Sequence, residues 1–182
     1  GDLAGGALYT AMGILAALHA RTASGRGCVV DTAMTQGCLH LLTAVFARLS
    51  VNAWQDAPAS NVIDGGVPWY RCYMTGDGRH MAVGAIEERF YRNFVEALGL
   101  APDALPPRHD KTRHGELTAR FQQRFLERTM AQWATQFEAV DACVTPVLSL
   151  REAQSDPVNR EAFVASDAVS LPHGVPCEVP HF

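Results

Sequence analysis

The beginning of the chain carries apolar residues at helical spacing. Leu8, Met12, Leu15 and Leu18 recur within residues 3–18, while alanine and glycine fill the other faces. Such small residues around an apolar stripe are typical of a helix packed against neighbours on all sides. The pattern predicts a helix that ends at the glycine-containing turn of residues 22–27.

Two further elements are predicted after this turn. The apolar run at residues 28–30 is typical of a short buried strand. Residues 32–49 have apolar positions at helical spacing, and Asp31 is placed to cap that helix. We therefore expect residues 1–49 to form a helix-strand-helix unit of α/β type.

The pattern changes after residue 50. Residues 50–66 show no sustained period and end in a glycine pair, which predicts a linker. Residues 69–75 and 80–85 are strand-like, and the sequence GDGR between them predicts a hairpin. We expect a second, smaller α+β domain at residues 67–148.

Helices and a last strand complete the predicted second domain. A short strand is expected at residues 144–148. Residues 149–182, which are loop-rich from residue 154, are predicted to be a return linker. Capping-box pairs, Thr129 with Gln132 and Ser149 with Glu152, predict two helix starts. The apolar stripes of the helices are formed by Phe90, Phe94 and Leu98, by Leu117, Phe121 and Phe125, and by Met130, Trp133 and Phe137.

Composition narrows the class of protein. The 182 residues are 48% hydrophobic and 19% charged, as in a globular protein. A formal net charge of -4 without a basic stripe argues against a nucleic-acid partner. The run at residues 3–18 is the membrane candidate, but it is short and rich in alanine and glycine, so we favour a buried helix and expect no membrane partner.

Cysteine and histidine usage gives no sign of a metal site. The five cysteines are widely spread without a CxxC pair, and the seven histidines lack the spacing of metal ligands. We therefore predict no bound metal and a reduced, cytoplasmic compartment.

Two segments carry carboxylates that are candidates for chemistry. In GDLAGG at residues 1–6, Asp2 stands at a helix start, where it is either an N-cap or a proton-transfer group beside the helix amides. In GAIEERF at residues 84–90, Glu87 and Glu88 are predicted in the first turn of a helix, where the helix dipole alone favours acids. The local pattern by itself favours the structural roles.

Five motifs in order resemble those of α-methylacyl-CoA racemases, members of the family III CoA-transferase (CaiB/BaiF) group. They are GDLAGG at residues 1–6, SGRGCVVD at 24–31, DGGVPWY at 64–70, DGRHMAVGAIE at 77–87 and DACVTPV at 141–147. The resemblance implies a Rossmann-like large domain, whose end is residues 1–49, followed by the smaller α+β domain. It also implies an interlocked homodimer with active sites between subunits. We expect the chain to be a C-terminal fragment that is inactive alone.

The resemblance also implies roles for individual residues. Asp2 would be one of two acid/base groups that exchange the α-proton of an acyl-CoA thioester through an enolate-like intermediate. Glu87 would reach across the dimer and hydrogen-bond the other base, a histidine expected upstream. Gly1, Leu3, Ala4 and Ile86 would contact the substrate. No cofactor is implied, because coenzyme A is part of the substrate.

Two alternatives to a racemase remain open. A CoA-transferase of the same family would use Asp2 as a nucleophile that carries the acyl group. The retained Glu87, in place of a glycine-rich loop, favours the racemase, although Glu88 stands where related racemases often have proline. The chain could instead be a non-catalytic dimerisation module, because the histidine segment is not among these residues.

Overall fold

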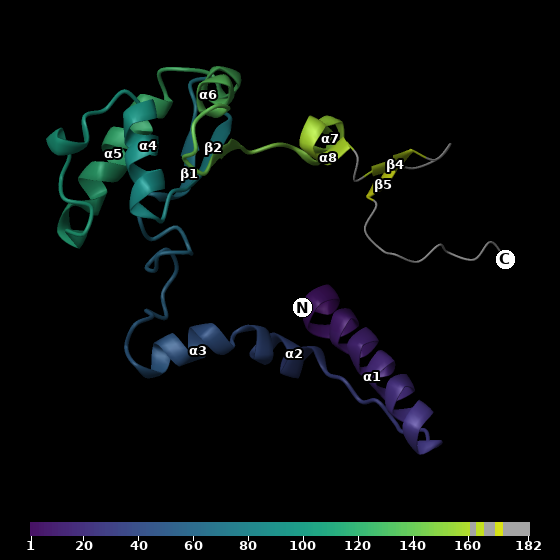
Figure 1. The fold of residues 1–182 in the computed structure, drawn as a ribbon. Helices are drawn as coiled ribbons and strands as arrows, with labels where there is room; N and C mark the ends of the chain where they lie inside the picture. Colours follow the sequence, from purple (N-terminus) through teal and green to yellow (C-terminus); the bar gives the residue numbers. More distant parts are fainter. Residues whose placement is uncertain (161–162, 166–169, 173–182) are drawn as a thin grey trace. The chain divides into compact units, whose positions relative to one another are not determined.

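A computed structural model describes residues 1–160, 163–165 and 170–172 (Figure 1). The chain divides into two compact units, Gly1–Asn61 and Val62–Phe182. The division falls inside the segment predicted as a linker, where residues 51–66 are turns, bends and irregular backbone.

The first unit is helical. The π-helix η1 (Asp2–Ala7) continues into α1 (Leu8–Ser24), and α2 (Met34–Leu41) and α3 (Thr43–Ser50) follow. The predicted end of the first helix is confirmed by Gly25, which has a φ of 67° and donates its N–H to the Arg21 carbonyl at 2.8 Å. Glycine takes this left-handed conformation without steric cost, and so it ends helices.

Three predictions for residues 28–49 are wrong. Residues 26–33 have no regular secondary structure, so the strand at residues 28–30 is not formed. A strand needs a neighbouring strand to satisfy its backbone, and residues 1–61 contain none. The helix predicted at residues 32–49 begins only after Ala33 and without a side-chain cap, so Asp31 does not cap it. It is also interrupted at Leu42, whose ψ of 5° is far from the helical value of about -42°.

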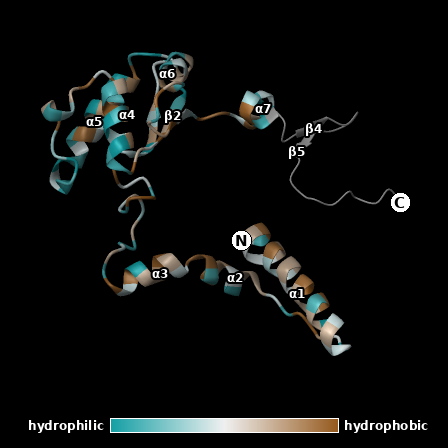
Figure 2. Ribbon diagram, in the orientation of Figure 1, coloured by the Kyte–Doolittle hydropathy of each residue, from teal (hydrophilic) through white to brown (hydrophobic). Residues whose placement is uncertain are grey.

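The first helix is largely uncovered. Figure 2 shows hydrophobic residues along α1, and none of its residues is buried. Leu8 and Leu15 are 66% and 67% exposed. Within residues 1–61, the prediction that this helix is packed on all sides is therefore wrong. These residues provide too few neighbouring elements to cover it. Among the described residues, Asp2–Ser24 is the one helical stretch long and apolar enough to cross a membrane, and the absence of a membrane partner stays a prediction.

A small antiparallel sheet organises the second unit. Strands β1 (Tyr70–Met74), β2 (His80–Gly84) and β3 (Val144–Pro146) lie in the order β1-β2-β3, with Tyr70 opposite Gly84 and Val83 opposite Val144. The predicted hairpin is confirmed: Gly78 in its turn has a φ of 75°, a conformation that favours glycine.

Helices cover this sheet and enclose the core. They are α4 (Glu88–Ala97), η2 (Pro102–Ala104), η3 (Lys111–Arg113), α5 (His114–Phe125) and α6 (Met130–Phe137). Most of the predicted stripes are confirmed as core. Phe94, Phe121, Phe125 and Trp133 are at most 1% exposed, and the Trp133 indole N–H donates to the Phe125 carbonyl at 2.9 Å. The buried ring nitrogen is thus satisfied.

The last described elements are α7 (Leu150–Ser155), α8 (Pro157–Arg160) and the antiparallel pair β4 (Phe163–Ala165) and β5 (Ser170–Pro172). Both predicted capping boxes are present, at Thr129 and at Ser149. The helix start predicted at Ser149 is therefore confirmed, whereas the loop-rich character predicted from residue 154 onward is wrong for α8, β4 and β5. The end of the predicted linker, residues 173–182, lies outside the described residues, and the linker role stays a prediction.

Candidate functional site

The first candidate segment forms the start of the N-terminal helix. Gly1 is the N-cap of η1 and Asp2 is its first residue, so the interpretation of Asp2 as an N-cap is wrong. Gly1, Asp2, Leu3 and Ala4 are all exposed. The Asp2 carboxylate is therefore accessible, and the residues predicted to contact substrate are its neighbours in the sequence.

This helix start has an unusually wide turn. The Gly1 carbonyl accepts hydrogen bonds from the N–H groups of Gly5 at 2.9 Å and Gly6 at 3.1 Å, and Leu8 donates to the Leu3 carbonyl. The bonds from Gly6 and Leu8 run five residues back, as in a π-helix, while the bond from Gly5 runs four residues back. Single π-turns are rare, and many of those that occur lie at functional sites. This turn could not be predicted from the sequence, since no side-chain pattern distinguishes it from an ordinary helix.

A close backbone contact fixes the turn on its neighbour. A β-carbon built on Gly37 of α2 would lie 1.9 Å from the Gly5 carbonyl oxygen, and Gly37 and Gly5 are both buried. Only glycine permits this approach. The position of the Asp2 turn on α2 therefore depends on these two glycines.

The second candidate segment joins β2 to α4. Glu87 is the N-cap of α4 with extended backbone (φ -71°, ψ 147°), and Glu88 is the first helical residue. Glu87 thus lies just before the first turn in which it was predicted. Its side chain is exposed and makes no capping bond, while its carbonyl accepts from the Tyr91 N–H at 2.9 Å. The carboxylate is free of a helix-capping role.

Backbone hydrogen bonds hold the residues that lead to Glu87. Gly84 donates to the Cys143 carbonyl at 2.9 Å, and Ala85 donates to the Trp69 carbonyl at 2.9 Å. Ile86 is half-buried, and its N–H donates to the Gly84 carbonyl at 2.9 Å. The strand therefore ends in an ordered connection rather than in a free loop.

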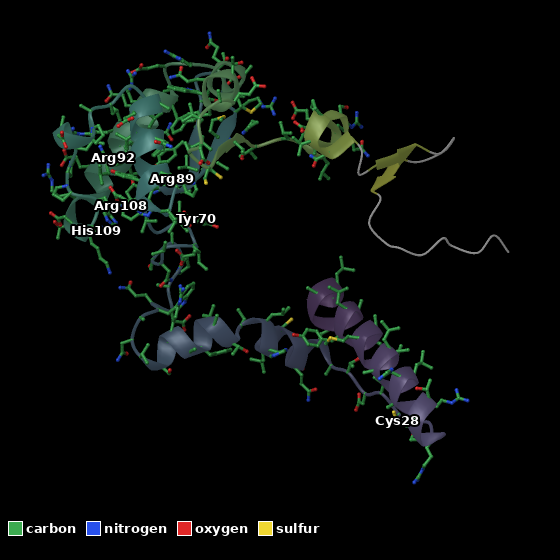
Figure 3. All side chains as sticks on the ribbon, viewed as in Figure 1. Cys28, Tyr70, Arg89, Arg92, Arg108 and His109 are labelled. Carbon is green, nitrogen blue, oxygen red and sulfur yellow. The ribbon has the colours of Figure 1, made fainter. Side chains whose placement is uncertain are left out.

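Sequence reasoning missed Arg108, which lies at this connection (Figure 3). Its guanidinium lies 4.5 Å from the Trp69 ring centroid and 4.6 Å from that of Tyr91. It donates to the Ile86 carbonyl and forms an ion pair with Glu88 at 3.0 Å. The sequence signal is only an arginine after a proline-rich loop, which does not indicate its partners.

Cys143 lies beside the same connection. Its φ is 52°, an uncommon conformation for a residue other than glycine. Burial raises the pKa of its thiol, and the charges of Glu87 and Asp141 act in the same direction. Asp141 itself pairs with Arg89 at 3.0 Å. A raised pKa favours the protonated thiol, which is the less nucleophilic form.

Asp2 and Glu87 belong to different units. Gly1 to Ala4 are consecutive at the start of η1, and Ile86 and Glu87 are consecutive at the β2–α4 connection. Among the described residues, no group of three or more histidine, cysteine, aspartate or glutamate side chains could hold a metal ion. The two candidate carboxylates thus lie at the start of η1 and at the β2–α4 connection.

A solved structure shares the fold of this chain. A crystal structure of Rv3272 from Mycobacterium tuberculosis superposes with a TM-score of 0.68 at 17% identity, over 96% of this chain and 47% of that chain. The sequence profile described as CoA-transferase family III matches residues 1–181. The chain belongs to CoA-transferase family III, and the predicted family is confirmed.

Individual relatives refine this membership. The alpha-methylacyl-CoA racemase of Mus musculus is 40% identical over 172 residues, and that of Homo sapiens is 39% identical over 168 residues. These matches cover 94% and 91% of this chain but 45% and 44% of the relatives. The succinyl-CoA–D-citramalate CoA-transferase of Chloroflexus aurantiacus is 27% identical over 168 residues, 92% of this chain and 39% of that protein. The chain thus spans less than half of each of these three relatives.

Proposed function

We propose that the protein containing this chain is an α-methylacyl-CoA racemase, which interconverts the (R) and (S) forms of 2-methylacyl-CoA thioesters. The observation that carries the proposal is identity: 40% and 39% to two such racemases, against 27% to a CoA-transferase over nearly the same residues. The retained Glu87 supports the same choice.

The proposed mechanism uses two bases on opposite faces of the α-carbon. One base takes the α-proton, and the C–H electron pair moves toward the thioester carbonyl to give an enolate-like intermediate. The conjugate acid on the other face then delivers a proton to the same carbon, which inverts its configuration. Asp2 is one of these groups, and its exposed position at the helix start supports access to substrate. The other is a histidine outside these residues.

The remaining predicted residues have supporting roles in this proposal. Glu87 hydrogen-bonds the histidine from the partner subunit of an interlocked homodimer, so that a carboxylate orients the imidazole. Gly1, Leu3, Ala4 and Ile86 contact the acyl-CoA. The small residues of the segment allow close approach of the thioester to helix amides, which favour a developing oxyanion. Coenzyme A enters with the substrate, so no separate cofactor is needed.

A family III CoA-transferase is the second candidate, because the Chloroflexus relative shares 27% identity. In that reaction Asp2 attacks the thioester carbonyl and coenzyme A leaves, so that the acyl group is carried as a mixed anhydride. The two reactions differ in their need for an acceptor acid.

The test uses the polypeptide of the complete reading frame that contains these residues. Each pure epimer of a 2-methylacyl-CoA is incubated without any free carboxylic acid, and the epimers are separated by chiral chromatography. A racemase brings both samples to the same mixture. Retained configuration, together with acyl-CoA turnover only when a free carboxylic acid is added, would support the transferase instead.

A further inference from the structure

We propose that Arg108 is a positioning residue for Glu87. Its guanidinium donates to the carbonyl of Ile86, the residue before Glu87, and pairs with the carboxylate of Glu88, the residue after it. One side chain therefore restrains both neighbours of Glu87. This inference rests on the proposed function, because the position of Glu87 matters for catalysis only if Glu87 orients the catalytic histidine.

The guanidinium is itself tightly held. The Arg108 side chain is only 9% exposed, and it lies over the rings of Trp69 and Tyr91 at 4.5 and 4.6 Å from their centroids. Cation–π attraction is strongest where the cation is shielded from water, as here. Figure 3 labels Arg108 in the part of the second unit that also holds α4 and α5. A donor fixed in this way can fix the carbonyl that it binds.

The backbone of Arg108 is also anchored. A His114 ring nitrogen, Nε2, lies 3.0 Å from the Arg108 carbonyl oxygen, and the His114 ring meets the Trp69 ring edge-on with centroids 5.0 Å apart. The restraint on Ile86 therefore leads back through Arg108 to Trp69, a residue that is 5% exposed and belongs to the core. The Glu87 connection is tied to the rigid part of its unit.

One buried atom suggests that Arg108 serves more than packing. Its Nε is buried and has no hydrogen-bond partner among the described residues. Burying an unsatisfied donor opposes folding, and an apolar side chain between the two rings would avoid that cost. An arginine does what an apolar residue cannot: its planar group presents several donors, which reach the Ile86 carbonyl and the Glu88 carboxylate together.

The kinetic test uses Arg108→Met in the full-length protein, with Arg124→Met as the matched control. Arg124 likewise donates to a carbonyl, that of Leu98 at 2.8 Å, and pairs with a glutamate, Glu127 at 2.6 Å. Misplacing a catalytic group lowers turnover on the order of 10²-fold. We expect Arg108→Met to lower kcat for α-proton exchange by that factor with a smaller effect on KM, because Arg108 does not itself contact substrate and acts through Glu87 and Ile86 in the proposal. Arg108→Lys should recover part of the loss, and a kcat for Arg108→Met equal to that of the control would overturn the proposal.

A second measurement is independent of the reaction. Amide hydrogen exchange of the segment 86–88 should be faster in Arg108→Met than in the wild type, and unchanged in Arg124→Met. Equal protection of this segment in a folded Arg108→Met protein would also overturn the proposal. If Arg108→Met fails to fold, Arg108→Lys is measured in its place. If the wild type shows no α-proton exchange, the proposed function fails, and the positioning claim is decided by amide protection alone.

Discussion

Arg79, the residue before β2, and Glu152 of α7 form a two-pronged ion pair, with Nη1–Oε1 and Nη2–Oε2 distances of 2.6 and 2.7 Å. Glu152 also completes the capping box with Ser149, whose backbone N–H donates to it at 2.8 Å. One carboxylate therefore both starts α7 and attaches that helix to the sheet.

This relationship predicts a pH-dependent contribution to stability. The hydrogen bonds from Arg79, and then those from Ser149, lower the pKa of Glu152 from 4.5 to about 2. Because the folded-state pKa is the lower one, the stabilisation is present above the unfolded value of 4.5 and is lost as the pH falls toward about 2. The thermal midpoint of Glu152→Gln should therefore be below that of the wild type at neutral pH, and the difference should vanish at the acid end of this range.

The control for Glu152 is Glu138→Gln. Glu138 is an exposed residue that follows α6, and it forms no ion pair with the described residues. Its variant should match the wild type at every pH. A Glu152→Gln difference that persists unchanged to about pH 2 would show that the ion pair is not its source.

Gly37→Ala should destabilise the first unit. Its β-carbon would lie 1.9 Å from the Gly5 carbonyl oxygen, so η1 and α2 must move apart. Overpacking of this kind costs about 1–3 kcal/mol, measurable as a lower midpoint of urea unfolding. Gly27→Ala is the control, because a β-carbon there meets nothing within 4 Å. Equal stability of the two variants would mean that the glycine contact is not tight.

Asp2→Asn should separate catalysis from folding. Gly1, not Asp2, is the N-cap of η1, and Asp2 is exposed, so the unfolding midpoint should not change. Loss of a proton-transfer group should lower α-proton exchange by about 10²- to 10⁴-fold. The same change at Asp31, which caps no helix, should leave exchange at the wild-type rate. Near-normal exchange by a folded Asp2→Asn enzyme would remove Asp2 from the mechanism.

The sequence was a good guide to the second unit, because its signals there are local. The glycine turn at Gly78, the capping boxes at Thr129 and Ser149, and the core position of Phe121 all follow from short patterns, and all are present. Such features depend on residues within a few positions of one another, so they can be predicted from the sequence alone.

The first unit and the details of the site were less predictable. An apolar run such as residues 28–30 forms a strand only if another strand pairs with it, and no local pattern supplies that partner. The bond from Arg108 to Ile86 joins residues far apart in the chain. The close contact of Gly5 with Gly37 likewise joins residues that are far apart in the chain. The spacing of residues within one segment does not predict which distant segment that segment contacts.

In the proposed function, the complete protein moves the α-proton of a 2-methylacyl-CoA. Each pure epimer is incubated with the protein in deuterated water, and the deuterium incorporated at the α-carbon is measured by mass spectrometry. Because an enolate-like intermediate loses its configuration and its original proton, both epimers should gain solvent deuterium and approach one mixture. Acyl transfer to a free carboxylate without any deuterium at the α-carbon would contradict the account.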